Sequence, residues 1–137
     1  MDALISINPE YAFAILRGEK KIEFRKRPIS KPIERCFIYI TAPYKAVYGY
    51  FTILEQELDH PDNLWNKYQN VGSIERLEYN SYFSNHSIGC AIHIGEVYKF
   101  SSPVLGILFK NPFTPPQSYF YLSQIDKTLL ANIEQIS

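Results

Sequence analysis

Gly18-Glu19-Lys20-Lys21-Ile22-Glu23-Phe24-Arg25 marks the change from a helix to a strand near the start of this chain. Gly18 is a typical residue at the end of a helix, because glycine tolerates a left-handed backbone. From Lys21 onward charged and apolar residues alternate, which indicates a strand with one solvated face. On such a strand Lys21, Glu23 and Arg25 share the charged face. Lys20 is out of phase with them, unless the chain is still turning after Gly18.

A short helix is predicted immediately before this stretch, and a strand before that helix. The apolar run Ala3–Ile7 is typical of a buried strand. Asn8 can cap the helix, Pro9 suits its first position, and Glu10 complements its dipole. Apolar residues at helical spacing then continue to Leu16.

The rest of the chain predicts more strands and a few short helices. Runs of β-branched and aromatic residues predict strands at Cys36–Thr41, Val47–Leu54, Ile88–Val97 and Pro103–Phe109. In the third of these, one face is apolar and consists of Ile88, Cys90, Ile92 and Ile94. Helices are expected from His60-Pro61-Asp62 to Tyr68, over Ile74–Phe83 with Ser73 as the cap, and over Ile125–Ile136, whereas Pro112–Gln117 is expected to be a loop. The fold class is therefore α+β, with five or six strands in a closed or nearly closed barrel flanked by short helices.

Length and charge limit what this chain can be. Its 137 residues suit a single domain over 1–137, with a terminal helix within 122–137. The formal net charge is zero, which argues against a protein that coats nucleic acid through a strong overall field. Ten of the fourteen basic residues nevertheless lie between Arg17 and Lys67, so the sequence allows a local basic site.

The two cysteines and the hydropathy predict a cytoplasmic setting without membrane contact. Cys36 and Cys90 lie in apolar runs, so buried free thiols are expected in place of a disulfide framework. The start of the chain lacks the pattern of a secretion signal. The sequence also lacks the roughly 18 consecutive apolar residues that a membrane helix needs.

Common enzymatic motifs do not occur in the sequence. A phosphate-binding loop, a dinucleotide fingerprint and a nucleophile elbow are all missing. His60, His86 and His93 are scattered, without the spacing of a metal-binding pair. We therefore predict neither a metal nor a cofactor.

The charged row of the opening stretch has a simple structural interpretation. Taken alone, it is most often a solvated edge strand with cross-strand ion pairs, which add little stability. Its surroundings change this interpretation, because a series of further segments accompanies it in a fixed order. These segments are Ser6-Ile7-Asn8-Pro9-Glu10-Tyr11-Ala12, Ile15-Leu16-Arg17-Gly18, Tyr39-Ile40-Thr41-Ala42-Pro43, Ala46-Val47-Tyr48-Gly49 and Pro115-Pro116-Gln117-Ser118-Tyr119.

The whole series resembles the ASCH domain, a family in the PUA-like superfamily, from about Ala3 to Leu122. The spacing of Gly18, Lys20, Glu23 and Arg25 looks like the signature of that family. The resemblance implies a small PUA-like β-barrel whose pocket accepts nucleic acid or a nucleoside. It places Lys20, Glu23 and Arg25 in the pocket, with weaker candidates at Ser6, Thr41, Gln117 and Ser118.

Two departures from the family bear on activity. One branch, the bacterial acetylcytidine amidohydrolases, uses a Lys that matches Lys20, together with a Thr and a distant Glu. The position of that Thr holds Glu23 here. Two residues, Glu55 and Glu96, are candidates for the distant Glu. Close relatives tend to carry Lys where this chain has Asn8, which removes one positive charge. Some other members of the family are reported nucleases.

The chemistry of the charged row suits a nucleotide. Lys and Arg can contact phosphate, and a carboxylate such as Glu23 can accept from the exocyclic amine of a base. Aromatic candidates for stacking on the base are Tyr39, Tyr48, Tyr82 and Phe83. A Lys beside a Glu stays charged unless it is desolvated, so Lys20 is expected to be a poor base. The leading hypothesis is a binding module for RNA or a nucleoside. The alternatives are a hydrolase of a modified nucleoside or of RNA that uses Lys20 and Glu23, and a protein-interaction domain.

Overall fold

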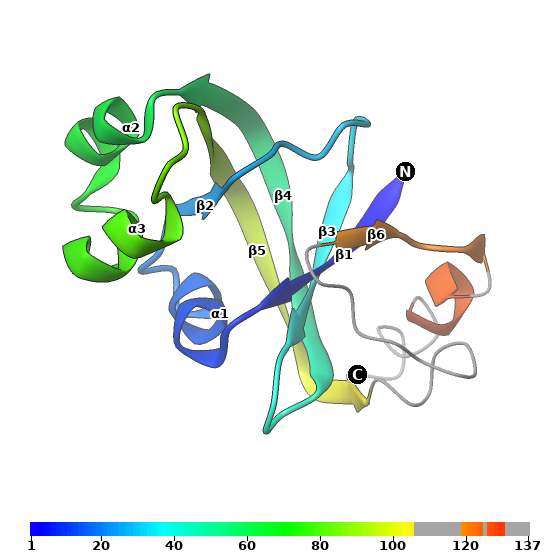
Figure 1. Cartoon of the computed structure of the whole chain (residues 1–137). Coiled ribbons are helices and arrows are strands. Elements are labelled where there is room, and N and C mark those ends of the chain that lie inside the picture. The colour runs from blue at the N-terminus through cyan, green and yellow to red at the C-terminus, as the bar shows by residue number, and fades with distance from the viewer. Residues whose placement is uncertain (106–118, 125, 131–137) are drawn as a thin grey trace.

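A curled half-barrel of six strands forms the centre of the computed structural model, which describes residues 1–105, 119–124 and 126–130 (Figure 1). The strand order is β2-β5-β4-β3-β1-β6, with β1 and β3 parallel and every other pair antiparallel. The α+β class and the expected number of strands are therefore confirmed for the described residues. The elements in chain order are β1 (Asp2–Ile7), α1 (Pro9–Leu16), β2 (Ile22–Arg25), β3 (Arg35–Ile40), β4 (Ala46–Asp59), α2 (Pro61–Tyr68), α3 (Arg76–Tyr82), β5 (Gly89–Leu105) and β6 (Tyr119–Tyr121).

Two long strands, β4 and β5, curl the sheet. They pair from Ala46 opposite Leu105 to Asp59 opposite Gly89, and the register shifts at several points along the way. Such bulges bend and twist a strand pair. Gly49 lies at one of these points, where an added Cβ would collide with the backbone carbonyl of Tyr98. Only glycine allows β4 and β5 to approach this closely.

The first two helices begin as the sequence predicts. The Oδ1 atom of Asn8 accepts from the backbone N–H of Glu10 at 3.1 Å, and Gly18 takes a φ of 78° after the end of α1. At α2 the His60 ring nitrogen accepts from the backbone N–H of Asp62, also at 3.1 Å. Each cap satisfies a backbone donor that has no partner within the helix.

The third helix begins later than the sequence predicts. It spans Arg76–Tyr82, and Glu75 is its N-terminal cap residue without a side-chain capping bond. Ser73 therefore does not cap it, and its φ of 49° instead belongs to the turn that leads into the helix. The expected boundary was wrong because Ser73 is a good cap by residue type, while the tertiary turn uses it differently.

Two predictions for the last third of the chain were wrong, and others fall partly outside the described residues. Pro103–Leu105 is part of β5 and not of a separate strand, because pairing with β4 continues to Leu105. Ile88 precedes β5 and is 53% exposed, so it does not join the apolar face of Cys90, Ile92 and Ile94. Residues 124 and 126–130 are helical within the expected terminal helix. The remainder of that helix and the expected loop at 112–117 lie outside the described residues.

Buried side chains fall into three clusters. One lies between the sheet and α1, and it contains the free thiols of Cys36 and Cys90, as predicted. A second includes Leu122 and Leu130 beside β1, β3 and β4. The third joins β2 to α2 and α3. In Figure 1, α1, α2 and α3 lie on one side of the sheet, and the helical residues 126–130 lie on the other, near the edge strand β6. Within the described ranges, every helix falls short of the length and apolar character needed to cross a bilayer.

Candidate functional site

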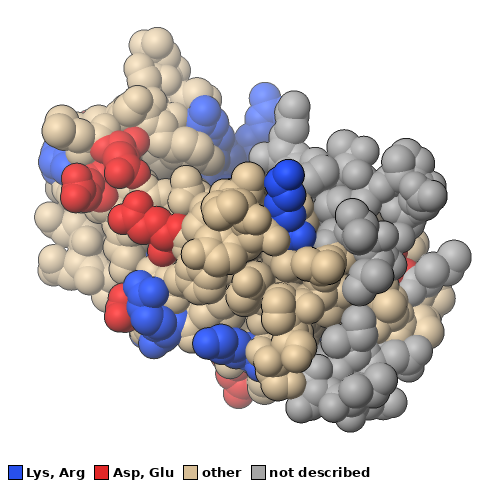
Figure 2. All heavy atoms as spheres, turned by 90° about the horizontal axis from the view of Figure 1, so that it is seen from below, with Lys and Arg blue, Asp and Glu red and all other residues tan. Residues whose placement is uncertain are grey.

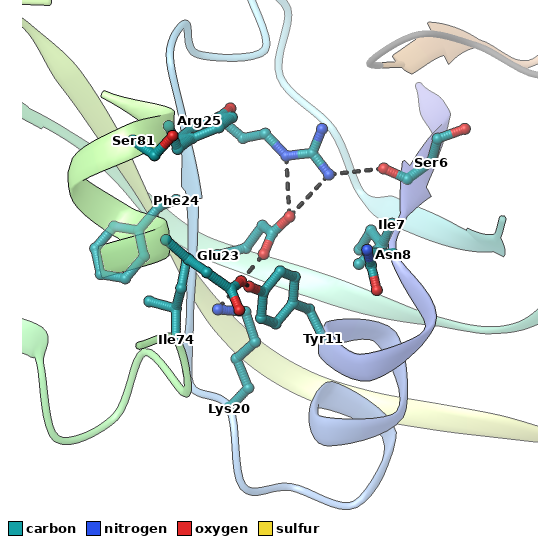
Figure 3. A pocket seen from close by; sticks show the side chains of 12 residues that line it. Ser6, Ile7, Asn8, Tyr11, Lys20, Glu23, Phe24, Arg25, Ile74 and Ser81 are labelled. Carbon is teal, nitrogen blue, oxygen red and sulfur yellow. Dashed lines mark hydrogen bonds and ion pairs between the residues drawn. The ribbon is translucent and has the colours of Figure 1, made fainter. Parts of the chain in front are cut away.

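A cavity of about 470 Å³ opens where β1, α1, β2 and α3 meet (Figure 3). This volume lies within the range typical of small-ligand sites. The lining combines charged, hydroxyl and aromatic side chains, and it comes from residues far apart in sequence. The lining residues are Ser6, Ile7, Asn8, Tyr11, Lys20, Glu23, Phe24, Arg25, Ile74, Glu78, Ser81 and Tyr82.

Three charged side chains form a linked group in the wall of this cavity. The Oε2 atom of Glu23 accepts from Arg25 Nε at 3.0 Å and lies 2.8 Å from Arg25 Nη2. The Oε1 atom of Glu23 lies 3.6 Å from Lys20 Nζ. The side chains of Lys20 and Glu23 are only 2% and 7% exposed, and that of Arg25 is 13% exposed. We call these three residues the charged triad, and it carries one net positive charge.

The turn after α1 brings Lys20 into the triad. The backbone N–H groups of Glu19 and Lys20 both donate to the carbonyl of Ala14, at 3.0 and 3.1 Å, so the chain folds back under the helix. The Lys20 ammonium group then donates to the backbone carbonyl of Gly72. The sequence predicted that Lys21 shares a strand face with Glu23 and Arg25. This was wrong for Lys21, which is exposed, and Lys20 lies beside Glu23 in its place.

The charged row is also not a solvated face. β2 is an edge strand of the sheet, yet Glu23 is 6% exposed, and its carboxylate lies between Lys20 and Arg25. Burial lowers the pKa of Lys20 from its usual 10.5, although the nearby carboxylate of Glu23 opposes this shift. The Lys20 ammonium group also lies 5.2 Å from the ring centre of Tyr11 and 5.5 Å from that of Phe24. Lys20 is therefore desolvated, which the sequence pattern did not predict.

Arg25 connects the two sides of the cavity. Its Nη2 atom donates to the backbone carbonyl of Ser6 at 2.8 Å, so β2 and β1 touch although no ladder joins them. The Ser6 hydroxyl group is buried and makes no hydrogen bond to any described residue. In Figure 3 this hydroxyl group points away from Arg25. Ser6 therefore meets Arg25 through its carbonyl oxygen and not through its side chain.

The other expected site residues have different outcomes. Thr41 is not among the lining residues, although its backbone N–H donates to the carbonyl of Ile7 at 3.2 Å. Gln117 and Ser118 lie outside the described residues. Of the four aromatic candidates for base stacking, only Tyr82 lines the cavity, and the others are Tyr39, Tyr48 and Phe83.

Several lining residues were not identified as candidates from the sequence. Tyr11 lies one helical turn from Asn8 and donates its hydroxyl hydrogen to Glu78 across the mouth of the cavity. Glu78 and Ser81 belong to α3, more than fifty residues further along the chain. The segment that carries the family resemblance includes Asn8 and Tyr11, so a signal for these two was present. No sequence signal linked α3 to this site.

Charged groups on one face of the molecule are mixed in sign. On the face that Figure 2 presents, Lys and Arg side chains are interspersed with Asp and Glu. This agrees with a formal net charge of zero. An anionic ligand on that face would meet no broad basic field, so attraction must come from local groups.

One group of described residues has the geometry to hold a metal ion. Glu55, Glu57 and His93 offer ligand atoms within 4.8 Å of one another on β4 and β5, outside the cavity. Glu57 is already engaged, because Lys67 Nζ lies 2.7 Å from its Oε2 atom and the Tyr68 hydroxyl donates to its Oε1 atom. These bonds, led by that of Lys67, lower the pKa of Glu57 to about 2. Both carboxylate oxygens of Glu57 therefore already have protein partners. Glu55 and Glu96 are not in the lining of the cavity.

Comparison with known proteins gives a full-length relative. The chain is 32% identical over 136 residues to an ASCH domain-containing ribonuclease from Zymomonas mobilis. The match covers 96% of this chain and 91% of the relative. This chain belongs to the ASCH domain family. No family model matches it.

Solved structures support the same assignment of this ASCH domain. The crystal structure of the ASCH protein from Zymomonas mobilis superposes with a TM-score of 0.89 at 28% identity, covering 96% of this chain and 94% of that one. A single-residue variant of that protein gives a TM-score of 0.90 at 27% identity, covering 96% and 95%. The PUA-like fold expected from the sequence is thus confirmed.

A second curated relative matches over a shorter range. It is named ATP synthase subunit alpha, from Ureaplasma parvum, and is 32% identical over 101 residues, which is 73% of this chain. The chain spans only 13% of that protein, so the matching region is one segment of a much longer sequence.

Proposed function

We propose that this ASCH domain binds RNA and holds one nucleotide in the cavity around the charged triad. The observation that carries the proposal is a buried group of two cations and one carboxylate in the wall of a ligand-sized cavity. Buried charges are costly unless they are paired, and they are often found at functional sites.

The triad leaves hydrogen-bonding capacity for a ligand. Arg25 engages the Oε2 atom of Glu23, whereas the Oε1 atom lies 3.6 Å from Lys20, beyond a normal hydrogen bond. Oε1 can therefore accept from the exocyclic amine of a base, as carboxylates do in base recognition. The net positive charge of the triad favours the phosphate of the same nucleotide.

Aromatic rings supply the remaining part of a nucleotide site. Tyr11 and Tyr82 line the cavity from α1 and α3. Stacking of a base on an aromatic ring contributes about 1–3 kcal/mol per base and tolerates any base. Recognition of RNA commonly uses unpaired bases stacked in this way. The Zymomonas relative is named a ribonuclease, which also supports RNA as the ligand class.

The test is a titration of the protein with short single-stranded RNA and with nucleoside monophosphates at low salt. Arg25→Gln should weaken the binding of both ligands at least tenfold, since a hydrogen bond to a charged group contributes about 1.5–3 kcal/mol. Arg17→Gln is the matched control, because Arg17 is exposed, has Glu19 as its ion-pair partner among the described residues and does not line the cavity. Absence of binding by the wild-type protein would reject the proposal. Equal affinity of the wild type and Arg25→Gln would reject this cavity as the site.

A second candidate function is RNA cleavage, which the name of the Zymomonas relative favours. The lowered pKa of Lys20 also leaves more of this amine unprotonated, and so available to accept a proton, than the sequence alone suggested. Incubation with end-labelled RNA tests this function, with Lys20→Met as the inactivating variant. Cleavage that persists unchanged in Lys20→Met would show a contaminating nuclease or another site. Binding without cleavage would leave recognition as the function.

A further inference from the structure

The loop between β2 and β3, residues 26–34, begins where the cavity ends. Lys26 follows Arg25 directly, and its Nζ atom lies 4.7 Å from the ring centre of Tyr82, a lining residue. Further along, Lys31 lies with its Nζ atom 5.1 Å from the ring centre of Tyr121 on β6. The loop therefore extends from the cavity at β2 to the opposite edge strand of the sheet (Figure 1).

Three cations on this loop have no acidic partner among the described residues. Lys26, Arg27 and Lys31 are exposed, and none of them takes part in an ion pair within the described ranges. The loop has a single acid, Glu34, which lies at its far end near the amino group of Met1, at 4.0 Å. The charge along this path is thus positive on a protein whose net charge is zero.

Hydrogen bonds fix the middle of the loop. Gln56 on β4 accepts from the backbone N–H of Ile29 at 2.8 Å and donates to its carbonyl at 3.0 Å. The Tyr121 hydroxyl accepts from the backbone N–H of Lys31 at 3.1 Å and lies 3.0 Å from the Ser30 hydroxyl. Ile29 is buried in the main core cluster. The loop cations are therefore held on a rigid backbone, which lowers the entropy lost when a ligand binds them.

We infer that the RNA strand leaves the cavity along this loop, where Lys26, Arg27 and Lys31 contact the phosphates of the flanking nucleotides. This inference rests on the proposed function, since it concerns the same RNA. Six residues from Arg25 to Lys31 span at most roughly 20 Å when extended, enough for a few nucleotides. The cavity recognises one nucleotide, and the loop supplies affinity that does not depend on sequence.

The test compares oligouridylates of increasing length, starting from uridine monophosphate, with a triple variant Lys26→Gln, Arg27→Gln, Lys31→Gln. Each phosphate contact adds about 0.7 to the salt slope of binding to a single strand, so the triple variant should lose about 2 from that slope. Between 50 and 200 mM salt, the wild-type affinity for the longer oligomers should then fall about 20-fold more than that of the variant. The affinity for the monophosphate should be the same in both proteins.

Two further variants make the result decisive. A control triple variant carries three substitutions elsewhere, Lys45→Gln, Lys99→Gln and Lys127→Gln. It loses the same amount of positive charge and should keep the wild-type slope. A double variant, Arg27→Gln with Lys31→Gln, keeps Lys26 and its contact with Tyr82, and it should lower the slope by about 1.4. Circular dichroism verifies that each variant is folded.

The outcomes separate the two proposals. If the wild type binds RNA and the loop variants keep its slope, or the control triple loses as much, the loop path is wrong and the cavity proposal stands. If the wild type binds monophosphate and longer oligomers equally well, the loop path is also wrong. If the wild type binds no RNA at all, the proposed function fails and the loop path with it.

Discussion

Replacing Glu23 with Gln should destabilise the fold strongly, because it leaves two buried cations without their carboxylate. In the native protein the carboxylate oxygens lie 2.8 Å from Arg25 Nη2 and 3.6 Å from Lys20 Nζ. An amide has one oxygen and one NH2 group, so it can serve one cation and must turn donors toward the other. Breaking a buried ion pair in this way costs about 3–5 kcal/mol.

The expected size can be converted into a melting temperature. The entropy of unfolding is about 2.1 cal/mol/K per residue, or roughly 0.29 kcal/mol/K for 137 residues. A loss of about 3 kcal/mol therefore lowers Tm by about 10 °C. Urea unfolding followed by circular dichroism should give the same loss of free energy with an unchanged m-value.

Two companion variants separate the triad from a general loss of charge. Glu19→Gln removes an exposed carboxylate whose partner is Arg17, and it should leave Tm unchanged. Adding Lys20→Met to Glu23→Gln removes one of the two uncompensated cations and should recover part of the loss. If Glu23→Gln lowers Tm by less than about 3 °C, the role of the triad in stability is refuted.

Three further predictions concern other parts of the protein. Gly72→Ala should destabilise the protein and weaken ligand binding, because the new Cβ would collide with the ring of Phe24 in the cavity wall; urea unfolding and RNA titration measure both effects. The wild type should have a larger free energy of unfolding than Glu57→Gln above about pH 4.5, and this difference should be lost as the pH falls toward about 2. The reason is that the ion-pair network lowers the pKa of Glu57, and urea unfolding between these pH values tests it. Native protein should react very slowly with a thiol reagent, because burial raises the pKa of Cys36 to about 12 and that of Cys90 to about 11; rapid native labelling would contradict their burial.

Local sequence signals were sufficient for the elements near the site. Asn8, Pro9 and Gly18 defined α1, because caps and helix stops depend on residue type and local backbone alone. Alternation placed β2 correctly, and β-branched runs located β3 and most of β4. The composition of the triad followed from the signature spacing, since all three residues lie within one short stretch.

Tertiary contacts determined what the sequence could not predict. Strand periodicity placed Lys21 beside Glu23, but the backbone bonds to Ala14 turn the chain so that Lys20 lies there. The contribution of α3 depends on packing between segments more than fifty residues apart, which no local pattern encodes. The burial of Glu23 was not predicted either, because periodicity describes faces and not what covers them.

The contact between Arg25 and the carbonyl of Ser6 has a practical consequence for identifying the ligand. The cavity lies between β1 and β2, two strands of the sheet that are not paired with each other. An occupant that touches both strands therefore holds the folded state together. At a concentration of 100 times its Kd, such a compound adds about 2.7 kcal/mol to the free energy of unfolding. For 137 residues this corresponds to a rise of about 9 °C in Tm. A thermal-shift screen of nucleotides and modified nucleosides can therefore rank candidate ligands with no assay of catalysis.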